Sequence, residues 1–275
     1  MNDVTFAFLL TIIAGTATGV GGLIIFLSKK TSKKFLSICL SFSAGAMLYI
    51  SFGEILLEAF EDLEYVLGDG VGYLVATVAF FGGILIVAAI DKFIPHNDEV
   101  AELTDYTQQS SDAALIEKDK KELKRTGVMA AIAIAMHNLP EGIVIFMAAL
   151  HDPALGVAIA LAIILHNIPE GIATAAPIYY STGNKLKAFL FAFCTGYVQV
   201  IGALTAWFLV RNVFDDMEAV FGIAFAAVAG IMVYVAIHQL LPAAQKFGKH
   251  HMVMKWLFAG MAVMAVSLVA LEFIF

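Results

Sequence analysis

Two six-residue segments of this sequence contain side chains that can bind a metal ion. Residues 137–142 read HNLPEG and residues 166–171 read HNIPEG, so each of these HNxPEG segments offers an imidazole, an amide and a carboxylate. Side chains three or four residues apart share one face of a helix. Two imidazoles and two carboxylates suit a four-coordinate Zn²⁺ site, and without a thiolate the same set also suits Fe²⁺, Co²⁺ or Mn²⁺. The candidate metal ligands are His137, Asn138, Glu141, His166, Asn167 and Glu170.

Both segments lie in apolar surroundings, where a carboxylate is costly. The chain of 275 residues is 61% hydrophobic and 14% charged, with a mean hydropathy of +0.88, whereas soluble domains are about 45–50% apolar and 25% charged. The apolar runs have the length of roughly 20 residues that crosses a bilayer as a helix, and they lack the alternation of β-barrel strands. A carboxylate at the bilayer centre costs at least about 2.5–3.5 kcal/mol. Because the HNxPEG segment occurs twice in apolar spans, its polar side chains indicate a bound cation rather than polar contacts that only hold two helices together.

The pattern of apolar runs predicts an all-α, polytopic membrane protein with eight transmembrane helices in a single domain, residues 1–275. The expected spans are residues 4–27, 36–57, 71–94, 127–150, 154–178, 186–210, 219–243 and 254–275. Turn residues and charges separate most of them. The longest connection, residues 95–126, is polar and carries both charge signs, and we expect it to be a flexible cytoplasmic loop.

The distribution of charge predicts the orientation in the membrane. Of the 16 Lys and Arg residues, all except Arg211 fall in or beside alternate loops, and the positive-inside rule places those loops in the cytoplasm. With eight spans in the plasma membrane, both termini then lie outside. The opposite loops are acidic, which either solvation or the attraction of cations would explain. The net charge of −7 argues against a nucleic-acid partner.

An internal repeat relates the first three spans to the last three. Residues 45–57 and 230–242 share Gly, Met and Tyr in register, and residues 15–21 and 196–202 match more weakly. Because the second and seventh spans run in opposite directions, the repeat is inverted and the arrangement is 3+2+3. Inverted repeats are typical of secondary transporters, whose substrate site lies near the membrane midplane. Glu54 and its repeat-mate Gln239, next to His238, either guard the two ends of a pathway or extend to the interface as solvated side chains.

The HNxPEG segments, the eight spans, the outward termini and the long loop after the third span together resemble the ZIP (Zrt/Irt-like) family of divalent-metal transporters, in particular its bacterial ZupT-like branch. This resemblance covers essentially the whole chain, and it implies metal uptake with the six residues above as ligands. It also implies that spans 1, 4, 5 and 6 move as a rigid body against the others. Many relatives bind two metals with an added carboxylate in span 6, where this chain has Gln199. In span 7, His238-Gln239 replaces an Asp-Glu pair. We therefore expect Gln199, Glu54, His238 and Gln239 to form at most a weak second site or part of the pathway.

These features together predict the inward transport of Zn²⁺ and other divalent transition metals (Fe²⁺, Mn²⁺, Co²⁺, Cd²⁺) across the plasma membrane, without enzymatic activity or a catalytic cofactor. A carrier of the same architecture that selects Fe²⁺ or Mn²⁺ is the main alternative. A haem protein ligated by His137 and His166 would leave two buried carboxylates beside the haem, and a membrane metalloenzyme would need a motif such as HExxH, which the sequence lacks. The expected partners are the metal ion, the lipid bilayer and, as a candidate, a second copy of the chain in a homodimer.

Overall fold

The computed structural model describes residues 3–27, 33–92, 113–212 and 217–273. Every regular element in these ranges is a helix, and eight stretches are long and apolar enough to cross a membrane. The expected all-α, polytopic fold with eight spans is therefore confirmed. The elements are α1 (Asp3–Leu27), α2 (Lys33–Ile50), η1 (Ser51–Ile55), α3 (Leu56–Leu67), α4 (Val71–Asp91), α5 (Ala113–His151), α6 (Pro153–Thr182), α7 (Lys185–Asn212), α8 (Met217–Tyr234), η2 (Val235–Leu240), α9 (Leu241–Phe247) and α10 (His250–Glu272).

Helix α5 is longer than the fourth expected span. It begins at Ala113, inside the segment 95–126 that we expected to be a loop. Residues 113–125 are rich in Ala, Leu, Glu and Lys, which favour helix, so the helix starts well before the apolar stretch that begins at Ile134. The earlier part of the expected loop, up to residue 112, lies outside the described residues. The assignment of the whole chain to one transporter domain remains a prediction.

The second and seventh spans each contain a π-helical turn. η1 lies between α2 and α3 in the span Lys34–Leu67, and η2 lies between α8 and α9 in the span Ala219–Phe247. The two turns fall at matched positions of the repeated segments, because η1 contains Glu54 and η2 contains its repeat-mate Gln239. π-Helical turns occur frequently at functional sites. The residues that we expected along a pathway thus lie where the helices are irregular.

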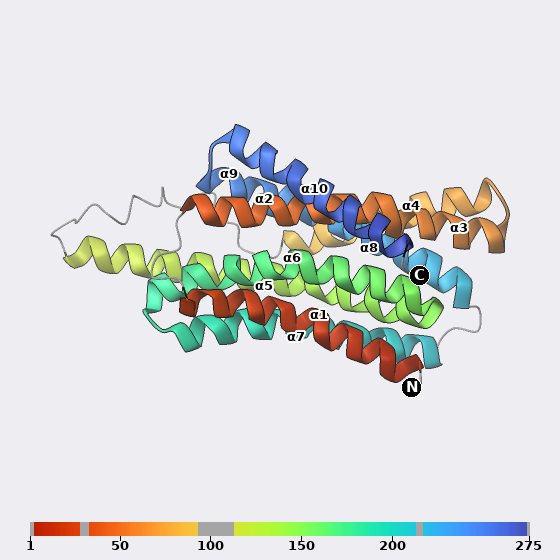
Figure 1. Cartoon of the computed structure of the whole chain (residues 1–275), viewed down its shortest axis with the longest axis horizontal. Helices are drawn as coiled ribbons and strands as arrows, with labels where there is room; N and C mark the ends of the chain where they lie inside the picture. The colour runs from red at the N-terminus through yellow and green to blue at the C-terminus, as the bar shows by residue number, and fades with distance from the viewer. Residues whose placement is uncertain (1–2, 28–32, 93–112, 213–216, 274–275) are drawn as a thin grey trace.

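The helices pack in two groups, which Figure 1 shows one above the other. Helices α1, α5, α6 and α7 form the first bundle, and α2, α3, α4, α8, α9 and α10 form the second bundle. The two bundles meet where α2 packs on α6 and where α8 packs on α5. The first bundle consists of spans 1, 4, 5 and 6, and it contains both HNxPEG segments.

Matched positions of the expected repeats make matched contacts. A Cβ atom added to Gly45 of α2 would overlap the carbonyl oxygen of Leu257 on α10, and one added to Gly230 of α8 would overlap the carbonyl oxygen of Phe80 on α4. Span 2 therefore lies against span 8 in the same way that span 7 lies against span 3. An inverted repeat of spans 1–3 and 6–8 would produce this pairing, and the repeat itself remains a prediction.

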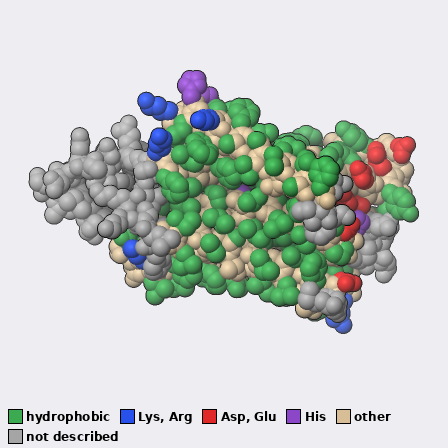
Figure 2. Space-filling view, viewed as in Figure 1, with side chains coloured by type: hydrophobic (Ala, Val, Ile, Leu, Met, Phe, Trp, Pro, Cys, Tyr) green, Lys and Arg blue, Asp and Glu red, His purple; other side chains and the backbone are tan. Residues whose placement is uncertain are grey.

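On the face shown in Figure 2, the described part of the protein is apolar between two charged ends. Large side chains such as Val78, Leu85, Phe208 and Val266 are more than half exposed, as expected of helices that face lipid. Both termini lie at one end (Figure 1). We call this end the acidic end; the acidic residues there on α3 and in the α3–α4 and α5–α6 turns are Glu58, Glu61, Asp62, Glu64, Asp69 and Asp152. The opposite, basic end carries Lys34, Lys92, Lys185, Lys187, Lys246, Lys249 and Lys255.

Close packing within the first bundle should be sensitive to a single methyl group. A Cβ atom on Gly142 of α5 would overlap the backbone carbonyl oxygen of Gln199 on α7, so Gly142→Ala should push the two helices apart and lower the melting temperature of the purified protein. Overpacking of this kind typically costs about 1–3 kcal/mol. Gly82→Ala in α4 is the matched control, because a Cβ atom there meets nothing within 4 Å. Equal melting temperatures for both variants would contradict the close contact between α5 and α7.

Candidate metal centre

The six predicted ligands lie together in the interior of the first bundle, and we call this cluster the centre. His137, Asn138 and Glu141 come from α5, and the equivalent residues of the second HNxPEG segment come from α6. Each of the six is at most 1% exposed. Because α5 and α6 are connected by a short turn and run in opposite directions, the two segments face each other head to tail. The helix period sets which side chains share a face, and the packing of the two helices places the two faces opposite each other.

The imidazoles and carboxylates of the centre pair across the two helices. Nε2 of His137 lies 2.9 Å from Oε2 of Glu170, and Nε2 of His166 lies 3.0 Å from Oε1 of Glu141. Each histidine therefore pairs with the glutamate of the other segment rather than with the glutamate four residues along its own helix. No lysine or arginine among the described residues lies within ion-pairing distance of either glutamate, and the basic partner of each is a histidine.

The two asparagines of the centre leave their amide oxygens available to a cation. Nδ2 of Asn138 donates to the carbonyl oxygen of Thr195 on α7 at 2.8 Å, and Nδ2 of Asn167 donates to the carbonyl oxygen of Ala14 on α1 at 3.0 Å. Both Oδ1 atoms are buried and accept no hydrogen bond from the described part of the chain. Buried acceptors without donors are costly, and a metal ion would satisfy them.

A serine that the sequence analysis did not select contacts the centre from the second bundle. Oγ of Ser43 on α2 donates to Oε1 of Glu170 at 2.9 Å and to the carbonyl oxygen of His166 at 3.2 Å. The signal for it was weak, because one serine in an apolar span is usually satisfied by its own helix. Through this residue the carboxylate of Glu170 contacts both bundles.

Comparison with known proteins identifies the family. The chain matches the family model described as "ZIP Zinc transporter" over residues 3–268. It belongs to the ZIP family. The chain is similar to the "Zinc transporter ZupT" of Clostridium perfringens, with 48% identity over 98% of this chain and 96% of the relative. The proteins of the same name from Chlorobaculum parvum and Nitratidesulfovibrio vulgaris are 48% and 49% identical, over 97% of this chain and 98% and 97% of the relatives. The resemblance seen in the sequence is confirmed, and the protein is a multi-pass membrane protein of a zinc-transporter family.

Gln199 of this ZIP protein lies beside the centre, and its role in a weak second site remains a prediction. It is fully buried on α7, and its Nε2 donates to Oε2 of Glu141 at 2.7 Å. Its Oε1 is buried without a hydrogen-bond partner in the described residues. The side chain therefore neutralises no charge, but it offers a third amide oxygen next to the carboxylate of Glu141.

The other expected pathway residues of this ZIP protein lie in the second bundle. Glu54 is partly buried in η1. In η2, Nε2 of Gln239 donates to Oδ1 of Asp91 at 3.0 Å, and Nδ1 of His238 lies 3.5 Å from Oδ2 of the same carboxylate, which also accepts a hydrogen bond from Tyr234. Asp91, a buried acidic residue at the last position of α4, was not among the residues predicted from the sequence. Its carboxylate holds η2 against α4 near the basic end, and a role of these residues in a pathway remains a prediction.

Proposed function

We propose that this ZIP protein carries Zn²⁺ and other divalent transition metals, including Fe²⁺, Mn²⁺, Co²⁺ and Cd²⁺, through the centre formed by α5 and α6. The observation that carries this proposal is the pair of crossed His–Glu contacts beside two buried amide oxygens without donors. Imidazole and carboxylate ligands without a thiolate are suited to Zn²⁺, and they discriminate only modestly among divalent transition metals. The similar proteins, each named as a zinc transporter, support zinc as the principal substrate.

We further propose that transport is directed inward across the plasma membrane. The lysine residues at the basic end support a cytoplasmic position of that end, with the acidic end and both termini outside. Acidic residues at the outer end raise the local concentration of cations, and the membrane potential then drives a dication inward. Membership of a transporter family supports a carrier rather than an enzyme.

Zinc flux into liposomes tests this function. Purified protein in vesicles with an inside-negative potential of about 100 mV should accumulate Zn²⁺ without ATP, measured with a zinc-sensitive dye inside the vesicles. The potential contributes about 2.3 kcal/mol per charge, so a dication gains about 4.6 kcal/mol, which is more than a thousandfold in accumulation. Protein-free vesicles are the control.

Competition in the same assay decides between zinc and the alternative substrates. Fe²⁺, Mn²⁺, Co²⁺ and Cd²⁺ should each slow zinc uptake when added outside, because the ligand set accepts all of them. Flux of Fe²⁺ or Mn²⁺ with no flux of Zn²⁺ would favour the selective carrier instead. Absence of any metal flux in vesicles that contain folded protein would contradict the proposed function.

A further inference from the structure

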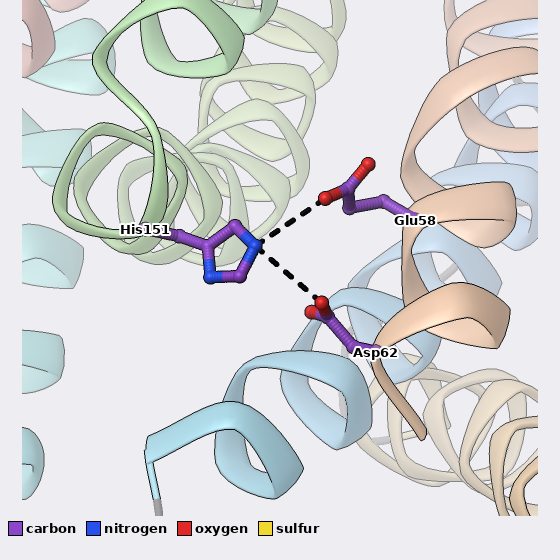
Figure 3. Close-up of side chains that lie close together, drawn as sticks. All are labelled: Glu58, Asp62 and His151. Carbon is purple, nitrogen blue, oxygen red and sulfur yellow. Dashed lines mark ion pairs between the residues drawn. The ribbon is translucent and has the colours of Figure 1, made fainter. Parts of the chain in front are cut away.

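A second group of metal-binding side chains lies at the acidic end, away from the centre. Glu58 and Asp62 of α3 face His151, the last residue of α5 (Figure 3). Nε2 of His151 lies 3.4 Å from Oε1 of Glu58 and 3.4 Å from Oδ1 of Asp62. One ligand atom from each of the three side chains lies within 4.8 Å of the other two. The group is only partly accessible to solvent, because the three side chains are 23%, 29% and 10% exposed for His151, Glu58 and Asp62.

The spacing of these atoms fits metal ligands better than it fits hydrogen bonds. Strong hydrogen bonds between nitrogen and oxygen are about 2.7–3.2 Å long, as are the two contacts of 2.9 and 3.0 Å in the centre. The contacts of His151 are longer than that range. Two ligands that are each about 2.0 Å from a tetrahedral Zn²⁺ lie about 3.3 Å apart. The imidazole nitrogen therefore already has nearly the separation from each carboxylate that a shared metal would impose.

The fold holds the three side chains in this arrangement before any cation binds. Glu58 and Asp62 are four residues apart, so they lie on one face of α3. The ring of His151 packs edge-on against Phe221 and Phe225 of α8, with centroid distances of 5.2 and 6.5 Å. Two helices of the second bundle thus orient the ligands, and the histidine comes from the first bundle.

The charges at this position favour a dication. Two carboxylates face one imidazole, so negative charge remains even when His151 is protonated. Glu61 and Asp152 act electrostatically on Glu58 and add further negative charge to its surroundings. A proton on the histidine can balance at most one of the two facing carboxylates, whereas a divalent cation balances both.

We propose that Glu58, Asp62 and His151 form a second divalent transition-metal site, at the acidic end and separate from the centre. One nitrogen and two oxygen ligands leave the fourth position of a Zn²⁺ ion open to water. The nitrogen ligand selects a transition metal over Ca²⁺ and Mg²⁺, which prefer oxygen ligands. Because the ligands come from both bundles, an ion bound here joins α3 to the end of α5.

Metal counting on the purified full-length protein tests this site. In equilibrium dialysis against Zn²⁺, the Asp62→Asn and His151→Gln variants should each bind one Zn²⁺ ion per chain fewer than the unchanged protein. Glu64→Gln is the matched control: it removes the same charge from a partly exposed position on the same helix and should lose no equivalent. Melting temperatures in a chelator show that each variant is folded, and Asp62→Asn keeps the volume of the side chain in case His151→Gln does not fold.

The same metal counts distinguish binding at this site from binding at the proposed transport centre. Glu141→Gln should keep the equivalent at the acidic end, and adding Asp62→Asn to that variant should remove it. Equal binding by the unchanged protein, Asp62→Asn and His151→Gln would overturn the proposal and leave a simple ion pair. Displacement of the ion by millimolar Mg²⁺ or Ca²⁺ would overturn the assignment to a transition metal.

Discussion

Replacing Glu141 by alanine should remove most Zn²⁺ uptake, by more than tenfold in initial rate, while the protein remains folded. The Glu141 carboxylate is fully buried and contacts both Nε2 of His166 and Nε2 of Gln199. Without it the centre has one negative charge fewer, and no solvent is available to replace that charge. A dication would then be incompletely balanced in a low-dielectric region, which costs several kcal/mol. Initial rates of zinc uptake into liposomes, normalised to the amount of folded protein, measure the effect.

Two further variants show whether charge or packing causes this loss. Glu141→Gln keeps the volume and an oxygen acceptor for the two neighbours but removes the charge, and it should be nearly as inactive as the alanine variant. Glu61→Gln makes the same chemical change on the exposed surface of α3 and should transport at close to the normal rate. Normal uptake by Glu141→Ala would show that the metal does not pass through the centre.

The centre of the unchanged protein should hold one metal ion tightly, and Gln199→Glu should create a second strong position. Metal ligation requires neutral histidines, so Glu141 and Glu170 contribute two negative charges, which balance one dication. A second dication would leave two positive charges with only amide oxygens near them, including Oε1 of Gln199. An uncompensated buried charge is strongly unfavourable, so we expect the second ion to bind much more weakly.

The added carboxylate of Gln199→Glu would replace the amide that now donates to Glu141 at 2.7 Å. Two carboxylates at that distance repel each other, so the variant should melt at a lower temperature in a chelator and regain stability with Zn²⁺. Titrations in the Asp62→Asn background, which removes the site at the acidic end, should count one tight equivalent with Gln199 and two with the glutamate. The stronger retention of metal should also slow its release during transport. If the protein with Gln199 unchanged bound two metal ions tightly, the centre would contain a further negatively charged ligand that this count of charges omits.

The sequence determined the spans and the chemistry of the centre, because both depend on local properties. Apolar runs long enough to cross a bilayer predicted all eight spans. The repeated His, Asn and Glu of the HNxPEG segments predicted six side chains that the structure buries together. Gln199 was selected differently, through the resemblance to the ZIP family, in which many relatives have a carboxylate at this position of span 6. Helix formation and membrane insertion follow from neighbouring residues, which a single sequence displays directly.

The tertiary structure decided which of these groups contact each other. The helix period alone gives no reason for His137 to pair with Glu170 rather than with Glu141, and only the packing of α5 against α6 sets the crossed arrangement. Ser43 lies 127 residues from its partner Glu170, and Asp91 is far in sequence from Gln239. His151 likewise meets Glu58 and Asp62 only because the end of α5 packs beside α3. Such contacts depend on how distant helices pack, which local hydrophobicity and residue spacing do not specify.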